Sequence, residues 1–273
     1  MVFAGIDAGS RAIKIVLLRS GRGATAPAGA GDRNGAPSVL CFAEHDQGPQ
    51  PGAATEEFYH RVLAENGLDR GRVRRAVATG YARAAVASAD ATITEITCHA
   101  AGVRHLLPQA RTVVEIGGQD SKLLRLAEDG GVRDFDMNDR CAAGTGRFLE
   151  LVADRLGCGL AGLGDLAGRA GQPAAISSMC AVFAETEIIG LLAGGRSPGD
   201  IVAGVQAAVA SRIAAMAGGR VVPPLAFTGG VARLPGMREA IGAALRHEAL
   251  VPDRPQFTGA LGAALLAMRE DGR

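Results

Sequence analysis

The sequence of 273 residues has no tryptophan, and aromatic residues make up only 4% of it. It also has no long run of basic residues, and its formal net charge is +1, so the charge pattern does not indicate a nucleic-acid surface. No uninterrupted apolar run approaches the length of a bilayer span, and no basic segment precedes the apolar run after Met1. We therefore expect a cytoplasmic protein that binds neither nucleic acid nor membrane.

Five cysteines are scattered through the chain, an odd number that argues against a disulfide framework. We expect them to be reduced thiols or metal ligands. Glycine, by contrast, is abundant at 39 residues, and hydrophobic residues reach 48%. The chain can therefore bury a large core, pack closely through small residues and make many tight turns. Its length suits one large domain or two of ordinary size.

A short motif occurs twice in the chain, each time between two apolar runs that are typical of strands. It consists of a carboxylate, a glycine two positions later and a lysine seven positions later. The positions are Asp7, Gly9 and Lys14 in the first copy, and Glu115, Gly117 and Lys122 in the second. Because an internal repeat indicates a duplicated architecture, we interpret the chain as two copies of one α/β unit that face each other across a cleft.

The order of the expected elements supports this duplication. In the first copy we expect strands at 2–6, 12–18, 38–43 and 75–80, helices at 55–66 and 95–107, and a flexible loop at 20–37. In the second copy we expect strands at 111–114, 123–126, 132–137 and 224–227, helices at 148–156, 181–192, 201–216 and 237–246, and a polar, glycine-rich stretch at 160–172. A final helix at 259–268 is expected to pack on the first copy. The expected lobes are 1–108 completed by 256–273, and 109–255.

Each repeated turn has the chemistry of a phosphate and metal site. A glycine lets backbone amides approach an anion closely, and the carboxylate can hold hydrated Mg²⁺. A further glycine-rich turn at 228–232 follows a strand and precedes a helix, so it can bring the backbone against a flat ligand or a phosphate. The alternative for this last segment is an ordinary strand-to-helix turn.

Two cysteines stand directly before runs with helical spacing. Cys141 lies at the mouth of a Gly-Thr-Gly turn, and the run after it closes at Gly157, while Cys180 precedes a second run that ends at Gly194. The N-terminus of a helix lowers the pKa of a thiol, so it can hold a thiolate or an anionic cluster. The alternative is that both cysteines are small buried hydrophobic residues, as most cysteines outside disulfides are.

Together these motifs resemble the actin, sugar-kinase and heat-shock ATPase superfamily. Within it, the chain resembles the family that includes the activators of 2-hydroxyacyl-CoA dehydratases and the ATPase subunits of benzoyl-CoA reductase. The matching segments cover nearly the whole chain: residues 5–10, 78–81, 116–120, 138–148, 178–187, 228–232 and 259–264. The resemblance implies an α/β fold of two duplicated ribonuclease-H-like lobes with a nucleotide cleft between them.

The resemblance also implies an ATPase that works as a one-electron donor. Family members are dimers of identical or paralogous subunits that share one [4Fe–4S] cluster, and the motifs carry its ligands over to Cys141 and Cys180 of each subunit. Four thiolates suit such a cluster, and a two-fold axis turns two ligands into four. Reduced ferredoxin or flavodoxin would supply the electron, and an acyl-CoA dehydratase or reductase component would accept it.

The same resemblance implies the nucleotide contacts. ATP or ADP with Mg²⁺ would bind between the lobes, with the metal near Asp7 and Asp120 and with Glu115 as the third catalytic carboxylate. Lobe closure on ATP would rotate the two helices that carry the cluster. Glu115 departs from the superfamily pattern, which usually has aspartate there. The other expected nucleotide-binding positions are Gly9, Ser10, Lys14, Gly117, Gly118, Gln119, Gly144, Gly146, Gly229 and Gly230.

Three alternatives remain open. The chain could be the ATPase subunit of a benzoyl-CoA reductase or a related reductase, a sugar or acetate kinase of the same fold, or a nucleotide sensor with negligible turnover. A kinase would not depend on Cys141. The remaining cysteines, Cys41, Cys98 and Cys158, are expected to be structural, and His99 receives no role because its spacing to other candidate ligands makes no metal site.

Overall fold

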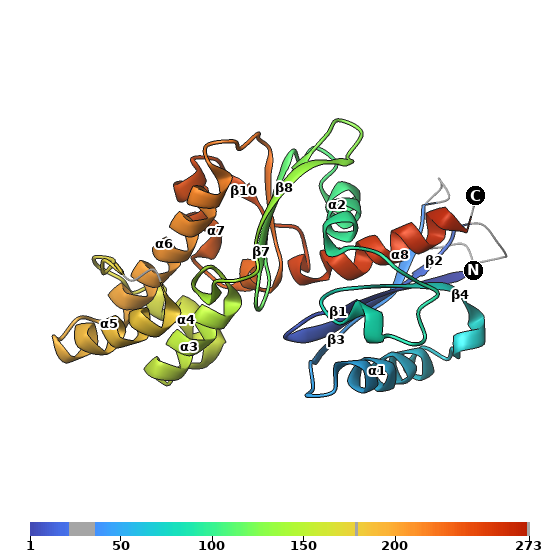
Figure 1. Ribbon diagram of the computed structural model, residues 1–273, viewed down its shortest axis with the longest axis horizontal. Coiled ribbons are helices and arrows are strands. Elements are labelled where there is room, and N and C mark those ends of the chain that lie inside the picture. Colours follow the sequence, from blue (N-terminus) through green and yellow to red (C-terminus); the bar gives the residue numbers. More distant parts are fainter. Residues whose placement is uncertain (22–35, 178–179, 272–273) are drawn as a thin grey trace, which may run out of the picture. The chain divides into compact units, whose positions relative to one another are not determined.

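The structure is a computed structural model that describes residues 1–21, 36–177 and 180–271. The expected loop at 20–37 therefore falls largely outside the described residues, as do Ser178 and Met179 of the second cysteine motif. The chain divides into two compact units (Figure 1): unit 1 is Met1–His105 with Phe257–Arg273, and unit 2 is Leu106–Gln256.

The sheet of unit 1 has the strand order β3-β2-β1-β4-β5. Its strands are β1 (Val2–Ala8), β2 (Ala12–Arg19), β3 (Ser38–Asp46), β4 (Val73–Thr79) and β5 (Ala91–Thr92). The first three strands form the expected antiparallel meander, whereas β4 runs parallel to β1 and β5 parallel to β4. All seven residues of β1 are buried, because helices cover both faces of the sheet at this strand.

The helices of unit 1 are α1 (Pro51–Glu65), α2 (Glu95–Leu106) and α8 (Thr258–Glu270), with short 3-10 turns η1 (Arg70–Arg72) and η2 (Arg83–Ala85). Alternation along β1 separates two cores. On one face, Ile6 packs with Phe58 and Tyr59 of α1. On the other, Phe3 packs with Ala263 of α8. The C-terminal helix therefore packs on the first sheet, as expected.

The sheet of unit 2 has the strand order β10-β9-β6-β7-β8. Taken from β8 to β10, this order is the same as that from β3 to β5 in unit 1. Its strands are β6 (Thr112–Ile116), β7 (Ser121–Leu126), β8 (Val132–Asn138), β9 (Leu225–Thr228) and β10 (Ala249–Leu250). Again three antiparallel strands are followed by two parallel ones. The duplication predicted from the two turns is therefore confirmed.

Five helices and two 3-10 turns lie wholly within the described part of unit 2, and a further 3-10 turn, η5 (Pro255–Phe257), spans its end. They are η3 (Ala142–Gly144), α3 (Gly146–Leu156), α4 (Gly159–Ala167), α5 (Ala181–Ala193), α6 (Pro198–Ala217), η4 (Gly230–Arg233) and α7 (Met237–Leu245). α6 is long and apolar enough, by length and composition alone, to cross a bilayer. Half of that apolar window is buried, with residues such as Val205 and Val209 in the core of unit 2.

The expectation of a polar stretch at 160–172 was wrong, because residues 159–167 form α4. The frequent glycines concealed a helical spacing of Leu160, Leu163 and Leu166, and Leu163 is fully buried in the core. Glycine is required at position 164 by packing, because a Cβ there would lie 2.5 Å from the ring of Pro235. The short strands β5 and β10 were also not predicted, since two residues carry too little periodicity.

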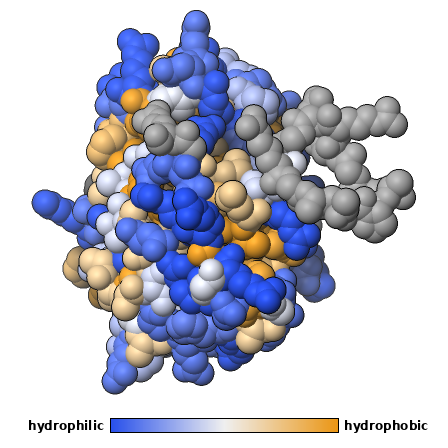
Figure 2. Space-filling view, turned by 90° about the vertical axis from the view of Figure 1, so that its right-hand side faces the viewer, coloured by the Kyte–Doolittle hydropathy of each residue, from blue (hydrophilic) through white to orange (hydrophobic). Residues whose placement is uncertain are grey.

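One face of the molecule is shown in Figure 2. Hydrophilic residues predominate on it, and hydrophobic residues form only small patches between them. This distribution agrees with a composition in which 21% of the residues are charged.

Candidate nucleotide site and cysteine pair

The first repeated turn begins inside β1, which extends two residues further than predicted. Asp7 is nearly buried near the end of this strand, and its Oδ2 lies 3.6 Å from Nζ of Lys14 on β2. A Cβ at Gly9 would lie 2.7 Å from the backbone oxygen of Ala12 and 3.3 Å from Nζ of Lys14. The absence of a side chain at Gly9 therefore keeps the turn tight, while Ser10 beside it is half-buried.

The second turn has the same frame but a stronger ion pair. Nζ of Lys122 on β7 lies 3.0 Å from Oε2 of Glu115 on β6 and 2.6 Å from Oδ2 of Asp120. The side chain of Lys122 is 2% exposed, that of Glu115 5% and that of Asp120 27%. Asp120 is thus the carboxylate that reaches solvent, whereas Glu115 is enclosed. Gly118 is half-buried and Gln119 is exposed between them.

The Gly-Gly turn after β9 packs directly on the second turn. Gly229 has φ of 90°, and a Cβ there would lie 2.3 Å from the backbone oxygen of Ile116 and 2.7 Å from Oε1 of Glu115. Its amide donates to the oxygen of Pro255 at 3.0 Å. Parallel pairing of β6 with β9 causes this approach, because Glu115 and Thr228 are register partners. The Glu115 carboxylate therefore borders both glycine turns of unit 2.

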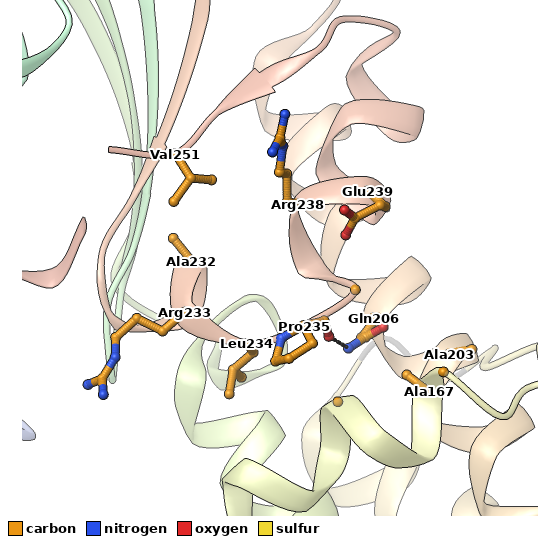
Figure 3. A pocket seen from close by; sticks show the side chains of 13 residues that line it. Ala167, Ala203, Gln206, Ala232, Arg233, Leu234, Pro235, Arg238, Glu239 and Val251 are labelled. Atoms are coloured by element: carbon orange, nitrogen blue, oxygen red, sulfur yellow. Dashed lines mark hydrogen bonds between the residues drawn. The ribbon is translucent and has the colours of Figure 1, made fainter. Parts of the chain in front are cut away.

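A cavity of about 490 Å³ follows the Gly-Gly turn in unit 2 (Figure 3). Gln206 on α6 donates from Nε2 to the oxygen of Pro235 at 2.8 Å, and this bond holds α6 against the segment that leads into α7. The cavity is lined by Gly164, Ala167, Gly168, Ala203, Gln206, Ala232, Arg233, Leu234, Pro235, Gly236, Arg238, Glu239 and Val251. Sequence reasoning missed this cavity, although the run Arg233-Leu234-Pro235 directly follows the glycine pair that it singled out.

Cys141 is exposed and precedes η3, not α3 as the sequence suggested. α3 begins only at Gly146, so the dipole of the long helix does not start at the thiol. The backbone of Cys141 is held on both sides by Asn138: its amide donates to Oδ1 at 3.0 Å, and Nδ2 donates to its oxygen at 2.9 Å. Gly144 lies beside the Asn138 side chain, and a Cβ at Gly144 would lie 3.1 Å from its Nδ2.

The second turn is hydrogen-bonded to the start of α3. The amide of Gly146 donates to the oxygen of Gly117 at 2.9 Å, and the amide of Arg147 donates to the oxygen of Gly118 at 2.8 Å. A Cβ at Gly146 would lie 3.0 Å from that same Gly117 oxygen. The candidate phosphate turn and the segment that carries Cys141 are therefore joined through backbone atoms inside one unit.

Cys180 is exposed and is the N-cap residue of α5, as predicted. α5 contacts α3, and Glu185 of α5 pairs with Arg155 of α3. The first turn of α5 exposes Val182 and Phe183 to 65% and 69%. Both candidate cluster ligands thus stand at the starts of helical segments in unit 2.

One chain does not assemble a complete metal site from the residues that the structure describes. Among them, no three or more His, Cys, Asp or Glu side chains are arranged to hold a metal ion. Cys98 is buried, and burial raises the pKa of its thiol to about 12, while Cys41 and Cys158 are half-buried. Two exposed thiols per chain fit a four-thiolate group only if a second chain supplies the other two.

Comparison with known proteins decides the family. Residues 4–267 match the BadF/BadG/BcrA/BcrD ATPase family. The chain belongs to this ATPase family. It is 41% identical over 264 residues to the activator of lactoyl-CoA dehydratase of Anaerotignum propionicum, and the match covers 96% of each chain. It is 33% identical to a benzoyl-CoA reductase subunit of Thauera aromatica, over 97% of this chain and 92% of that one.

A solved structure supports the fold of this BadF/BadG/BcrA/BcrD ATPase. The activator of the 2-hydroxyisocaproyl-CoA dehydratase from Clostridium difficile, with bound ADPNP, superimposes with a TM-score of 0.88 at 36% identity. The match covers 100% of this chain and 96% of that chain. The resemblance stated from the motifs, the two-lobed actin-like fold and the ATPase assignment are all confirmed.

Proposed function

We propose that the protein is an ATP-driven one-electron donor that activates a 2-hydroxyacyl-CoA dehydratase. The proposal is supported by the relatives compared above, among them the activator of lactoyl-CoA dehydratase and the activator of 2-hydroxyisocaproyl-CoA dehydratase. Reduced ferredoxin or flavodoxin supplies the electron in the cytoplasm, and the dehydratase component accepts it. ATP hydrolysis allows this transfer to an acceptor too negative for the donor alone.

The nucleotide is held by the repeated turns. Backbone amides of the Gly9 turn and of the Gly117 turn contact the phosphates, with Lys14 beside the first turn and Gly118 and Gln119 in the second. Ser10 lies next to Gly9 and supplies a further donor. Mg²⁺ is coordinated near Asp7 and Asp120, whose carboxylates suit a hard cation.

The adenosine side lies along Gly229 and Gly230. The cavity beyond them, lined on different sides by Arg233 and Gln206, receives the base, because it is concave and contains few polar groups. Glu115 does not coordinate metal in this scheme, since its carboxylate is enclosed by Lys122. It instead holds the second turn and the Gly-Gly turn together.

Cys141 and Cys180 bind one [4Fe–4S] cluster together with the same two residues of a second, identical or paralogous subunit. When bound, the cluster stores one electron at low potential. The chain's own contribution is to present two thiols at exposed backbone positions. Asn138 holds the first of these in place, and the second is the N-cap residue of α5.

The observation that carries the proposal is the bonding of the second turn to the start of α3. A phosphate that binds or leaves at Gly117 and Gly118 changes the two hydrogen bonds to Gly146 and Arg147, each worth about 0.5–1.5 kcal/mol. The position of the segment with Cys141 therefore depends on whether ATP or ADP is bound. Differential binding of ATP and ADP to two arrangements of this segment is what coupling requires.

The second candidate function is that of the ATPase subunit of a benzoyl-CoA reductase. It is favoured by the 33% identity to one subunit of that enzyme over nearly the full length of both chains. The same residues would serve both functions, and only the acceptor differs. Electron transfer to dehydratase components, compared with transfer to ring-reductase components, distinguishes the two.

The test is anaerobic measurement of iron, sulfide and the EPR spectrum of dithionite-reduced protein. We expect about four irons per dimer, and we expect the reduced signal to disappear in Cys141→Ala and in Cys180→Ala. The matched control is Cys158→Ala, which removes a half-buried thiol from the same unit and should keep iron and signal.

A result without iron in the anaerobic wild-type protein, with ATP hydrolysis equal in wild type and Cys141→Ala, would reject the cluster. A kinase of the same fold would then be the better explanation. If iron is present but ATP leaves electron transfer to a dehydratase unchanged, the coupling is wrong while the cluster stands.

A further inference from the structure

A buried histidine of unit 1 lies beside the first turn and has no role in the function proposed so far. His99 of α2 is 5% exposed, and its Nδ1 lies 2.9 Å from Oγ1 of Thr258 at the start of α8. Thr258 is fully buried as well. The bond joins residues 159 positions apart, so the ring orientation depends on how α2 and α8 cross.

Glycines create this crossing. A Cβ at Gly102 would lie 2.0 Å from the oxygen of Thr258, and a Cβ at Gly262 would lie 1.7 Å from the oxygen of Cys98. On the other side of α8, a Cβ at Gly5 of β1 would lie 1.9 Å from the oxygen of Ala260. The three elements therefore meet backbone to backbone. This close approach brings a side chain of α2 to the end of β1.

The carboxylate of Asp7 lies near Nε2 of the histidine. A Cβ at Gly259 would lie 3.2 Å from Nε2 of His99 and 3.3 Å from Oδ2 of Asp7, so both atoms border one small space. The other oxygen faces Gly80, where a Cβ would lie 2.5 Å from Oδ1. The carboxylate of Asp7 thus lies against two positions, Gly80 and Gly259, at which a side chain would crowd it. Nζ of Lys14 lies 3.6 Å from Oδ2.

We propose that His99 is a positioning residue for Asp7. In this arrangement the Thr258 hydroxyl donates to Nδ1, which leaves the ring proton on Nε2, the nitrogen that borders the same space as the carboxylate; an ionised carboxylate only accepts. The carboxylate is thereby held in the orientation in which it meets the metal ion of the bound nucleotide. His99 acts through Asp7 and is not itself a metal ligand. This inference rests on the proposed function, in which Asp7 holds Mg²⁺.

The experiment measures metal binding directly, with Mn²⁺ in place of Mg²⁺. Free Mn²⁺ is quantified by room-temperature EPR while it is titrated into the anaerobic dimer saturated with ADP. We expect His99→Ala to weaken Mn²⁺ binding by about 10- to 100-fold, as is usual when a partner of a metal-binding carboxylate is removed. The affinity for metal-free ADP, from calorimetry, should change less than about twofold. His99→Gln, which keeps a donor, should recover part of the loss.

Two variants guard against a purely structural effect. Thr258→Val keeps the shape of the side chain but removes the hydroxyl, and Gly259→Ala places a methyl group between ring and carboxylate while favouring the helix. Both should weaken Mn²⁺ binding in the same direction as His99→Ala. His105→Ala changes an exposed histidine on the same helix and should bind Mn²⁺ as the wild type does.

Mn²⁺ binding by His99→Ala within twofold of wild type would overturn the inference. Equal losses for Mn²⁺ and for metal-free ADP would overturn it too, because they would indicate a damaged nucleotide site. A wild-type protein that binds Mn²⁺ with ADP but does not hydrolyse ATP would instead contradict the proposed function, and the Mn²⁺ comparison would still decide the role of His99.

Discussion

The ion pair at the second turn makes a quantitative prediction about stability. Lys122 is buried between two carboxylates, and Lys122→Met removes its charge while shortening the unbranched side chain by only one atom. Glu115, itself 4% exposed, then loses this cation from its surroundings. Removal of one partner from a buried pair costs about 3–5 kcal/mol, because the remaining charge stays desolvated. For a unit of this size the loss corresponds to a fall in Tm of about 6–20 °C.

The assay is urea unfolding followed by circular dichroism, together with hydrogen–deuterium exchange of peptides from β6 and β7, because the two units need not unfold together. The matched control is Arg238→Met in the same unit, whose pair with Glu248 is exposed and should contribute at most about 1 kcal/mol. Adding Glu115→Gln to Lys122→Met should restore more than half of the loss. Equal losses for Lys122→Met and Arg238→Met would refute the reasoning.

Two further predictions concern packing and pH. Gly204→Ala in α6 should lower the free energy of unfolding by about 1–3 kcal/mol, because the new Cβ would lie 2.0 Å from the oxygen of Ala174. Gly190→Ala in α5 has no described atom within 4 Å of the new Cβ, so it should leave the free energy of unfolding unchanged or raise it by up to about 1 kcal/mol. Urea unfolding of both variants checks this. Burial raises the pKa of Cys98 from 9.0 to about 12, so its contribution to stability is complete below pH 9 and is lost as pH rises towards 12. The free energies of unfolding of wild type and Cys98→Ala should therefore converge as the pH rises from 8 to 11. Iodoacetamide at pH 8 should label the exposed Cys141 of the cluster-free protein before the buried Cys98.

Either of two results would contradict these predictions. A Gly190→Ala variant as unstable as Gly204→Ala would show that the close approach at Gly204 is not the cause. Labelling of Cys98 at the rate of Cys141 in the folded protein would show that the thiol is not protected by burial.

The surroundings of Glu115 suit its long side chain. Oε1 of Glu115 lies towards the Gly-Gly turn, at 2.7 Å from the point that a Cβ of Gly229 would occupy, and Oε2 meets Lys122. The longer side chain thus spans the distance between two turns. Asp120 is the more exposed of the two carboxylates that pair with Lys122, which is why the proposed function gives the metal ion to Asp120 and not to Glu115.

The sequence alone determined the duplicated architecture, because strand periodicity and glycine turns are local properties that repeat when a unit is duplicated. It identified nearly all strands and helices, and the N-cap position of Cys180 followed from the apolar run after it. It failed at α4, whose glycines are there for tertiary contact with Pro235, and at Cys141, where a 3-10 turn separates the thiol from α3.

Only the tertiary structure decided which distant residues lie close together. Glu115 borders Gly229 because β6 and β9 are parallel register partners, and His99 and Asp7 border one space because glycines let β1, α8 and α2 touch through their backbones. Neither proximity has a local signature, since each depends on segments more than 90 residues apart in the chain. Local chemistry therefore indicated the turns and thiols, while the packing of whole elements selected the residues that surround them.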